Sequence, residues 1–365
     1  MASNPTYFLD DHVNGDQILQ VDRRWIYGGK IEKRFEFSDM LSLNTGIEGR
    51  YDDIGPVGVH HTVSQEILST ISLHETQEGS AAAYGEVTWL PIENLRLMAG
   101  ARGDTYSFDV KAIDPGSVGG SANASIFSPK LGAAYSATPW LELYGNWGRG
   151  FHSNDARGIT NLDQQALAQG TGKEGGARLQ YEGFNFTATY WWLDEDSELV
   201  FVGDSNSVEP RGSSAREGYE LVMFWRPYDW LAIDGVWTHT HSRFLDSPGA
   251  EFIPGSLEEA AELGFAANWP EYELSMRLRY IGEYPLVEDN SERAEADMLV
   301  NFRAAWKPGR FTIYAELLNA LDHDGKDVVY WYNSLLPGEP VEGVEGRLSR
   351  PEEPRSVRVG LKYTF

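Results

Sequence analysis

The C-terminal segment Ser356-Val357-Arg358-Val359-Gly360-Leu361-Lys362-Tyr363-Thr364-Phe365 alternates apolar and polar residues without a break. Successive side chains of a β-strand point to opposite faces. The segment therefore predicts a strand with a polar face and an apolar face, the latter made by Val357, Val359, Leu361, Tyr363 and Phe365. An amphipathic last strand that stops on an aromatic residue is typical of a membrane β-barrel, which carries aromatic residues where its strands leave the bilayer. An ordinary half-buried final strand would alternate in the same way, so the rest of the chain must decide.

The composition agrees with an all-β protein and excludes several other classes. Aromatic residues make up 13% of the 365 residues and glycine counts 38, which suits many strands joined by turns. The absence of cysteine excludes disulfides, thiolate zinc sites and cysteine nucleophiles. A formal charge of −25 disfavours nucleic-acid binding, because such a surface repels phosphates.

The hydropathy pattern predicts no membrane-spanning helix, because no run of about 18 apolar residues occurs. The mean hydropathy of −0.40 is still compatible with a membrane barrel, in which only alternate residues of each strand face lipid. The first residues, Met-Ala-Ser-Asn-Pro-Thr-Tyr, lack a basic region followed by an apolar one, so no signal peptide is expected within the chain.

The alternation of the last strand recurs along the whole chain. We count about sixteen strand-like segments, many of about ten residues, which is the length of a tilted membrane-spanning strand. Clear examples lie at residues 95–102, 141–148, 184–192, 274–280, 300–307 and 311–318. Their polar faces carry arginine, lysine, glutamate and asparagine in mid-strand. The chain is therefore predicted to be one domain, residues 1–365, folded as an antiparallel transmembrane-type β-barrel of about 16 strands.

The connections between these segments fall into two length classes. Tight turns marked by proline or glycine lie at residues 137–140, 226–230, 269–271 and 306–310. Long polar connections are expected at residues 109–126, 150–173, 203–214 and 322–354. Short turns at one end and long loops at the other are typical of outer-membrane barrels.

Several motifs resemble the C-terminal barrel of TonB-dependent outer-membrane receptors. Six occur in family order: Ala99-Gly100-Ala101-Arg102-Gly103-Asp104, Ser128-Pro129-Lys130-Leu131-Gly132, Trp147-Gly148-Arg149-Gly150-Phe151-His152-Ser153-Asn154-Asp155-Ala156-Arg157-Gly158, Phe252-Ile253-Pro254-Gly255-Ser256, Leu317-Leu318-Asn319-Ala320-Leu321-Asp322, and the closing strand. The resemblance implies the family's barrel fold and makes the last strand, Val357 to Phe365, a barrel-closing strand and assembly signal.

The chain also departs from that family. Full receptors carry an N-terminal plug inside a barrel of about 22 strands, together with a short segment that contacts the energy-coupling protein TonB, and neither is recognised here. The resemblance implies a C-terminal fragment, a truncated gene product or a plugless variant. A closed barrel and an open sheet that needs further strands both remain possible.

Two loop regions are candidate ligand contacts. The first is His152, Asn154, Asp155 and Arg157, a mixed-charge cluster in a predicted long loop; its members could instead anchor that loop. The second is Tyr330, Trp331 and Tyr332, three aromatic residues that could stack on a ring of a ligand or instead mark an aromatic girdle.

No constellation supports catalysis, so we expect no enzyme and no cofactor. Residues 212–215 lack the Gly-x-Ser-x-Gly pattern, and the pair His239 and His241 lacks a carboxylate at a diagnostic offset, so no metal site is predicted. The basic residues Arg102, Arg277, Arg279, Arg303, Arg358 and Lys362 are expected to face inward, where they would pair across strands with acids such as Glu142, Glu273 and Glu316.

By resemblance, the expected function is that of a receptor in the outer membrane of a Gram-negative cell, which takes up a siderophore–iron complex or a similar scarce solute. Its outer loops and inner wall would bind the ligand. TonB would be a partner only if an N-terminal plug domain were supplied. The alternatives are a passive porin-like pore and a truncated barrel that does not transport. Expected partners are membrane lipid and a small-molecule ligand, with no nucleic acid.

Overall fold

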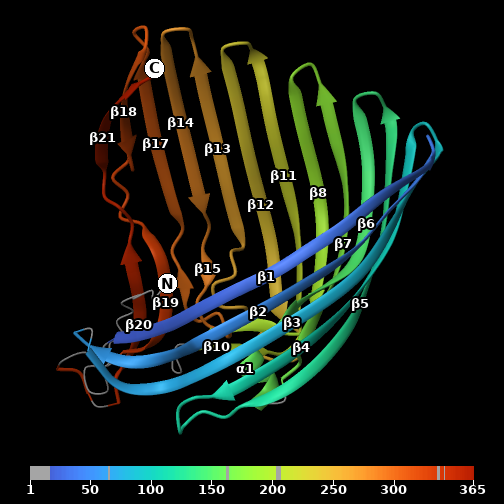
Figure 1. Ribbon diagram of the computed structural model, residues 1–365. Helices are drawn as coiled ribbons and strands as arrows, with labels where there is room; N and C mark the ends of the chain where they lie inside the picture. Colours follow the sequence, from blue (N-terminus) through green and yellow to red (C-terminus); the bar gives the residue numbers. More distant parts are fainter. Residues whose placement is uncertain (1–16, 65, 162–163, 203–206, 335–337, 341) are drawn as a thin grey trace.

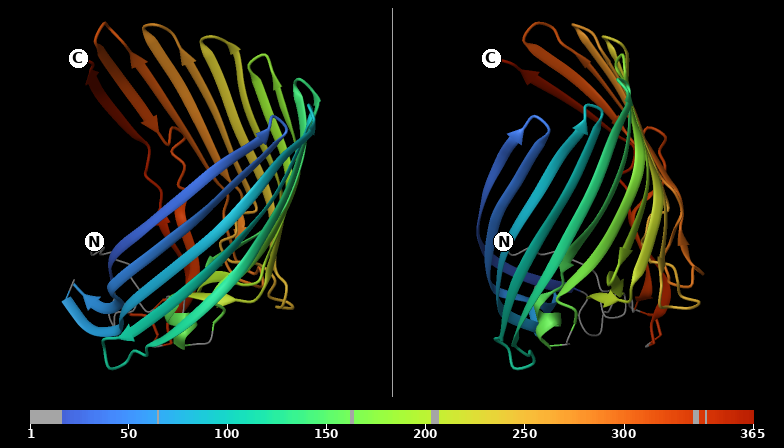
Figure 2. Two further views of the ribbon diagram at one scale, coloured as in Figure 1. Left: turned by 45° about the vertical axis from the view of Figure 1, so that its right-hand side comes forward. Right: turned by 90° about the vertical axis from the view of Figure 1, so that its right-hand side faces the viewer.

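The computed structural model describes residues 17–365 except 65, 162–163, 203–206, 335–337 and 341. Fifteen strands form one antiparallel sheet, in which each strand pairs with the next sheet strand along the chain (Figure 1). The sheet curves like the wall of a barrel (Figure 2). This confirms the predicted all-β, antiparallel barrel-type architecture.

The first half of the sheet is made of long strands. They are β1 (Gln17–Ser38), β2 (Leu41–Val63), β3 (Glu66–Ile92), β4 (Leu95–Ala112), β5 (Gly120–Thr138), β6 (Leu141–Ser153), β7 (Leu167–Tyr181) and β8 (Phe184–Glu195).

The second half has strands of 8 to 15 residues, closer to the predicted length. They are β11 (Ser214–Tyr228), β12 (Leu231–Phe244), β13 (Glu259–Asn268), β14 (Tyr272–Ile281), β17 (Asp297–Trp306), β18 (Phe311–Leu318) and β21 (Ser356–Tyr363).

The remaining elements lie in the long connections, which gather at one end of the sheet, the long-loop end; the tight turns lie at the other, the short-turn end (Figure 1). Three pairs form two-stranded hairpins: β9 (Glu198–Val202) with β10 (Ser207–Arg211), β15 (Tyr284–Pro285) with β16 (Arg293–Ala294), and β19 (Lys326–Ser334) with β20 (Val344–Pro351). One short helix, α1 (Ala156–Asn161), follows β6.

Two details of the sequence prediction were wrong. The expected loop at 109–126 is mostly strand, because β4 continues to Ala112 and β5 begins at Gly120. Strands β1 to β5, which have 18 to 27 residues, far exceed the expected ten. The backbone of a polar residue such as Asn123 forms the same interstrand hydrogen bonds as that of an apolar residue. The pairing of β4 with β5 therefore continues beyond the point where the apolar pattern ends.

Strands β1 and β21 are the two edges of the sheet. Within the part of the chain that the structure describes, β1 pairs with β2 alone and β21 with β18 alone. Figures 1 and 2 show β1 running obliquely, away from β21. The role of Val357, Val359, Leu361, Tyr363 and Phe365 in closing a barrel therefore stays a prediction.

The register sorts the side chains of the sheet into two faces, as the alternation predicted. One face is apolar from strand to strand; for example, Leu278 of β14 lies opposite Val300 of β17. Val357, Val359 and Leu361 on this face are 68%, 74% and 66% exposed, although they are aliphatic. The opposite, inner face carries the charged side chains and is the face that α1 covers. Among the described residues, none of the helical segments has the length and apolarity needed to cross a membrane.

Glycines of the inner face give room to large neighbouring side chains. A Cβ on Gly176 of β7 would lie 2.5 Å from the carbonyl oxygen of Ala188 and 2.7 Å from the hydroxyl of Tyr144. Tyr144 is held in place, because its hydroxyl lies 2.6 Å from Oγ1 of Thr189 and the guanidinium of Arg178 lies 3.9 Å from its ring centroid. The absence of a side chain at residue 176 thus lets β6, β7 and β8 pack closely.

Gly176→Ala should destabilise the sheet by about 1–3 kcal/mol, the usual cost of overpacking, because a backbone oxygen cannot move aside cheaply. Gly172→Ala is the matched control, since a Cβ there meets nothing within 4 Å on the same strand and face. Urea unfolding followed by tryptophan fluorescence, with the chain in detergent, measures both. Equal stability of the two variants would contradict the packing argument.

Candidate functional site

The first predicted ligand cluster lies between β6 and α1, where its members hold the loop together. The backbone N–H of Asn154 donates to the carbonyl of Ala166 at 3.0 Å, and its side-chain amide donates to the carbonyl of Gln165 at 2.7 Å. Asp155 accepts a hydrogen bond from the backbone N–H of Arg157 at 2.8 Å and another from its Nε at 2.9 Å.

Apolar contacts fasten the same loop to the inner face. Ala156, Ile159 and Leu167 form a buried cluster with Phe108 and Val110 of β4. The contacts of Asn154, Asp155 and Arg157 therefore support the alternative of a loop anchor. His152 has a buried Nε2 without a hydrogen-bond partner among the described atoms. Ligand contact by these four residues stays a prediction.

The second predicted cluster lies on β19 of the β19–β20 hairpin. Tyr330 is paired with Leu348, Trp331 with Arg347, and Tyr332 with Gly346. Tyr330 is 42% exposed. This hairpin follows β18, whereas α1 contacts β4 and β5, so the two predicted clusters belong to different parts of the long-loop end.

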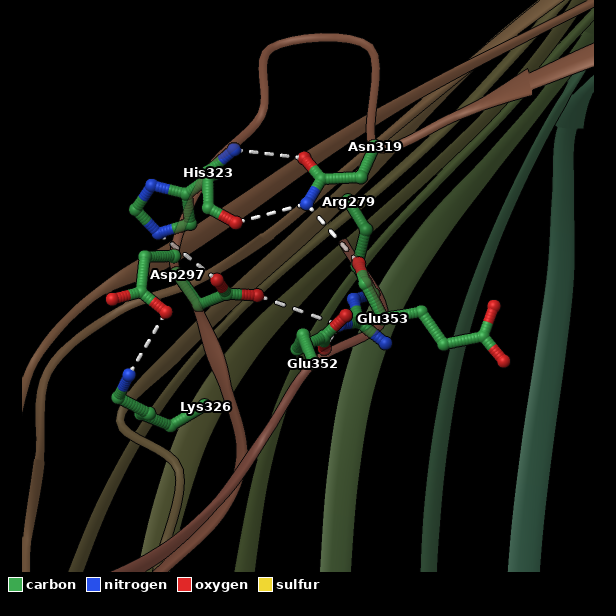
Figure 3. A network of polar contacts seen from close by, with 8 residues as sticks. Arg279, Asp297, Asn319, His323, Lys326, Glu352 and Glu353 are labelled. Carbon is green, nitrogen blue, oxygen red and sulfur yellow. Dashed lines mark hydrogen bonds and ion pairs between the residues drawn. The ribbon is translucent and has the colours of Figure 1, made fainter. Parts of the chain in front are cut away.

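A polar network anchors the connection from β18 to β21 (Figure 3). Asn319, which is 3% exposed, lies at its centre. Its Oδ1 accepts the backbone N–H of His323 at 2.9 Å, and its Nδ2 donates to the carbonyls of His323 and Glu353 at 2.8 and 3.2 Å. Its own N–H donates to Oδ1 of Asn301 at 2.9 Å. The motif residue Asn319 thus joins both ends of the long connection.

Charged groups extend this network toward β14. Nη2 of Arg279 pairs with Oδ2 of Asp297 at 3.4 Å and also with Glu352, while Nε2 of His323 lies 3.1 Å from Oδ1 of Asp297 (Figure 3). Asp297 is 7% exposed. Through Arg279, the loop segment around Glu352 is therefore linked to a buried carboxylate of β17.

The inner face carries cross-strand ion pairs, as the sequence predicted. Arg303 pairs with Glu273 and Glu316 at 3.1 and 3.5 Å, and Arg102 pairs with Glu48 at 3.0 Å. Further pairs join Glu142 to Arg96 and Arg178, Arg277 to Asp234 and Glu262, and Arg358 to Glu353. These pairs join neighbouring strands or strands two apart, except that Glu353 lies before β21, and they neutralise much of this wall locally.

The apolar outward face ends in a polar row near the long-loop end. The register aligns Lys173, Trp192, Glu217 and His241 across β7, β8, β11 and β12. His239, two residues from His241 on β12, shares this outward face. Among the described residues, no three metal-ligating side chains gather to hold an ion.

A pocket on the inner face near the long-loop end was not predicted from the sequence. It has a volume of about 390 Å³ and is lined by Trp191, Glu198, Arg216, Thr240, Ser242 and residues 253–257; we call it the wall pocket. One sequence signal pointed to it: Trp191 is an aromatic residue on the polar face of its strand. The approach of β9 and of residues 253–257 to that wall has no local sequence signature.

A family model described as the β-barrel of TonB-dependent receptor-like proteins matches residues 2–320. The chain belongs to the TonB-dependent receptor β-barrel family. No curated protein matches its sequence.

Solved structures of similar fold are TonB-dependent receptors. The ferric yersiniabactin uptake receptor FyuA from Yersinia pestis is 15% identical with a TM-score of 0.74, and the match covers 94% of this chain and 54% of FyuA. The copper transporter OprC is 14% identical with a TM-score of 0.73, covering 96% of this chain and 57% of OprC. The ferric citrate transporter FecA is 14% identical with a TM-score of 0.73, covering 94% and 55%. The chain thus spans little more than half the length of these receptors.

Asn319→Ala should release the connection between β18 and β21, because three side-chain hydrogen bonds at a buried site are lost, worth about 2–4 kcal/mol together. The residue also has a φ of +47°, which alanine tolerates less well. Limited proteolysis within residues 326–351 should be at least tenfold faster. Asp324→Ala is the control, because it removes one exposed ion pair with Lys326. Equal cleavage rates would contradict the anchoring role.

The loop around α1 should loosen at acidic pH. Partial burial opposes ionisation of Asp155, but the hydrogen bonds and charge of Arg157 outweigh it and hold the pKa of the carboxyl below its usual range. The stabilisation is therefore complete above the ordinary pKa of about 3.9 and is lost as the pH falls through the lower folded-state value. Proteolysis within residues 154–166 should accelerate only below about pH 4. Asp155→Asn should show fast cleavage already at pH 7; unchanged cleavage would refute the role of Asp155.

Proposed function

We propose that the chain is the ligand-binding barrel wall of an outer-membrane receptor for a scarce solute such as a siderophore–iron complex. The observation that carries the proposal is the family match combined with the two-faced sheet. An apolar outward face suits lipid, and a charged inner face suits a wetted interior.

The long-loop end would be the outer mouth, since outer-membrane barrels have short periplasmic turns and longer external loops. At this end α1 packs on the inner face, Glu198 of β9 is paired with Arg216 of β11, and Asn319 is hydrogen-bonded to Asn301 of β17. Tyr330, Trp331, Tyr332 and His152 remain proposed ligand contacts here. Loops anchored in this way present their side chains at lower entropic cost than free loops would.

The charge of the chain gives no reason to expect a strongly anionic solute. The formal charge is −25, and the arginines of the inner wall are largely paired with carboxylates. Energy-coupled uptake would depend on a plug and on TonB. With neither, the same wall would act as a passive pore, which is the alternative outcome of the test.

Uptake should therefore require TonB. The chain, preceded by the plug segment of a related receptor, is expressed in a Gram-negative strain without its own iron receptors. Growth under iron limitation on a panel of ferric siderophores and transport of radioactive iron are measured with and without TonB. We expect at least one chelate to support growth only when TonB is present.

Two outcomes would contradict the proposal. Uptake that persists without TonB, together with stable open steps in a planar bilayer, would identify a passive pore. No binding of any chelate by the folded, plug-bearing protein would indicate a barrel that does not transport.

A further inference from the structure

A second pocket of the inner face lies beside the wall pocket, shares Trp191 with it, and has a floor of bare backbone. Its volume is about 710 Å³. The register places Gly148 of β6 opposite Gly172 of β7, and Gly150 opposite Gly170. These four glycines form a continuous patch on the inner face. We call the pocket above this patch the glycine groove.

The space above this floor is open. A Cβ on Gly150 or on Gly172 would meet no described atom beyond its chain neighbours within 4 Å. The helix α1 packs on β4 and β5 instead. A glycine inside a strand weakens that strand, and it often marks a place where another group approaches the backbone closely. The groove is therefore shaped for a flat group that lies on the sheet.

An apolar wall borders the floor on the side of β8. Leu193 is paired with Gly172, and Trp191 lies two residues away on the same face of β8. Both side chains are half-buried. The indole of Trp191 lies against the next strand, because a Cβ on Gly218 of β11 would be 2.9 Å from its Cζ2. This wall can pack against an apolar ring.

The charges at the long-loop end of the groove do not cancel. Glu195, which is paired with Gly170, faces Glu198 of β9 as well as Arg216 of β11. Oε1 of Glu198 accepts Nη2 of Arg216 at 2.6 Å, so this guanidinium is already engaged. Two carboxylates therefore share one cation, and Glu195, which lines the groove, has no cation of its own.

The other inward side chains of the lining do not supply a free positive charge. Nζ of Lys130 lies 2.5 Å from Oε2 of Glu86, and Glu174 accepts a hydrogen bond from the neutral amide of Asn146 at 2.6 Å. Two basic residues that alternate with the floor glycines belong to the outward face, namely Arg149 and Lys173. The inner lining is therefore negative, and it would concentrate cations.

We propose that the glycine groove binds a flat organic cation, with bare backbone as its floor, Trp191 and Leu193 as its apolar wall and Glu195 as its counter-charge. A planar amidinium or guanidinium matches a carboxylate, because two parallel N–H groups can donate to the two oxygens. The volume of about 710 Å³ falls in the range of small-molecule sites. The proposal deepens the proposed receptor function by naming the shape and charge of its ligand, and it rests on that function only for its role in uptake.

Three probes of the same shape and different charge test the groove: benzamidine, which is a cation at neutral pH, neutral benzamide and anionic benzoate. Isothermal titration of the full chain in detergent should show binding of benzamidine that weakens at high salt. Benzamide should bind at least about tenfold more weakly, and benzoate should not bind. Absence of benzamidine binding, equal binding of benzamide or any binding of benzoate would overturn the proposal.

Glu195→Gln should weaken benzamidine binding at least about tenfold, because the counter-charge is lost. The variant should fold, since it removes a carboxylate that competes with Glu198 for Arg216. Glu93→Gln is the matched control, because it removes an exposed acid at the turn between β3 and β4 and should leave the affinity unchanged.

Gly172→Val should also weaken binding at least about tenfold, because its side chain would fill the groove. Gly103→Val on the outward face of β4 is the control, since a Cβ there likewise meets nothing within 4 Å. Urea unfolding followed by tryptophan fluorescence identifies the folded variants. Unchanged benzamidine affinity in folded Glu195→Gln or in folded Gly172→Val would overturn the proposal, as would an equal loss in Gly103→Val.

Failure of this proposal is distinguishable from failure of the receptor function. TonB-dependent uptake that ignores both Glu195→Gln and Gly172→Val would leave the receptor proposal intact and remove the groove from it. Benzamidine binding that depends on both residues, in a protein without uptake, would do the reverse.

Discussion

The structure depends on one continuous ladder of backbone hydrogen bonds between antiparallel neighbours. Because side chains alternate along each strand, the ladder separates apolar from charged residues over fifteen strands, and within the described part of the chain the helix α1 lies on the inner face. In a bilayer each backbone polar group must find an internal partner, which only a helix or a closed sheet provides. That constraint makes the two edges, β1 and β21, the part of the fold that most needs a neighbour.

The inner face shows how a chain with so many acids can build a charged wall. Arginines reach carboxylates on their own strand, as Arg102 does with Asp104, and on neighbouring strands, as Arg303 does with Glu273 and Glu316. Glycines such as Gly176 and Gly218 make room for Tyr144 and Trp191, so these large side chains pack directly against the backbone of the neighbouring strand. Charge pairing and close packing therefore occur in the same layer, and both depend on the register.

The sequence predicted the fold well because the signal is local. Alternation identified the apolar faces of β14, β17, β18 and β21 residue by residue, since a period of two is set within each strand. Strand ends were less predictable. Polar residues at the ends of β4 and β5 look like loop by composition, yet their backbones continue the ladder. The motif around Asn319 was recognised by resemblance, but its role as an anchor for Glu353 became visible only in space.

By itself, the sequence determined the fold class, the two faces of each strand, the inward arginines and the family, because these follow from alternation and short motifs. Only the tertiary structure decided which acid meets which arginine, since partners such as Arg102 and Glu48 are 54 residues apart in the chain. It likewise decided that Asp155 and Arg157 hold a loop, and that Arg216, Ser242 and Trp191 share one pocket. The physical reason is register: which residues of two strands stand opposite each other depends on the whole ladder, and no single segment carries that information.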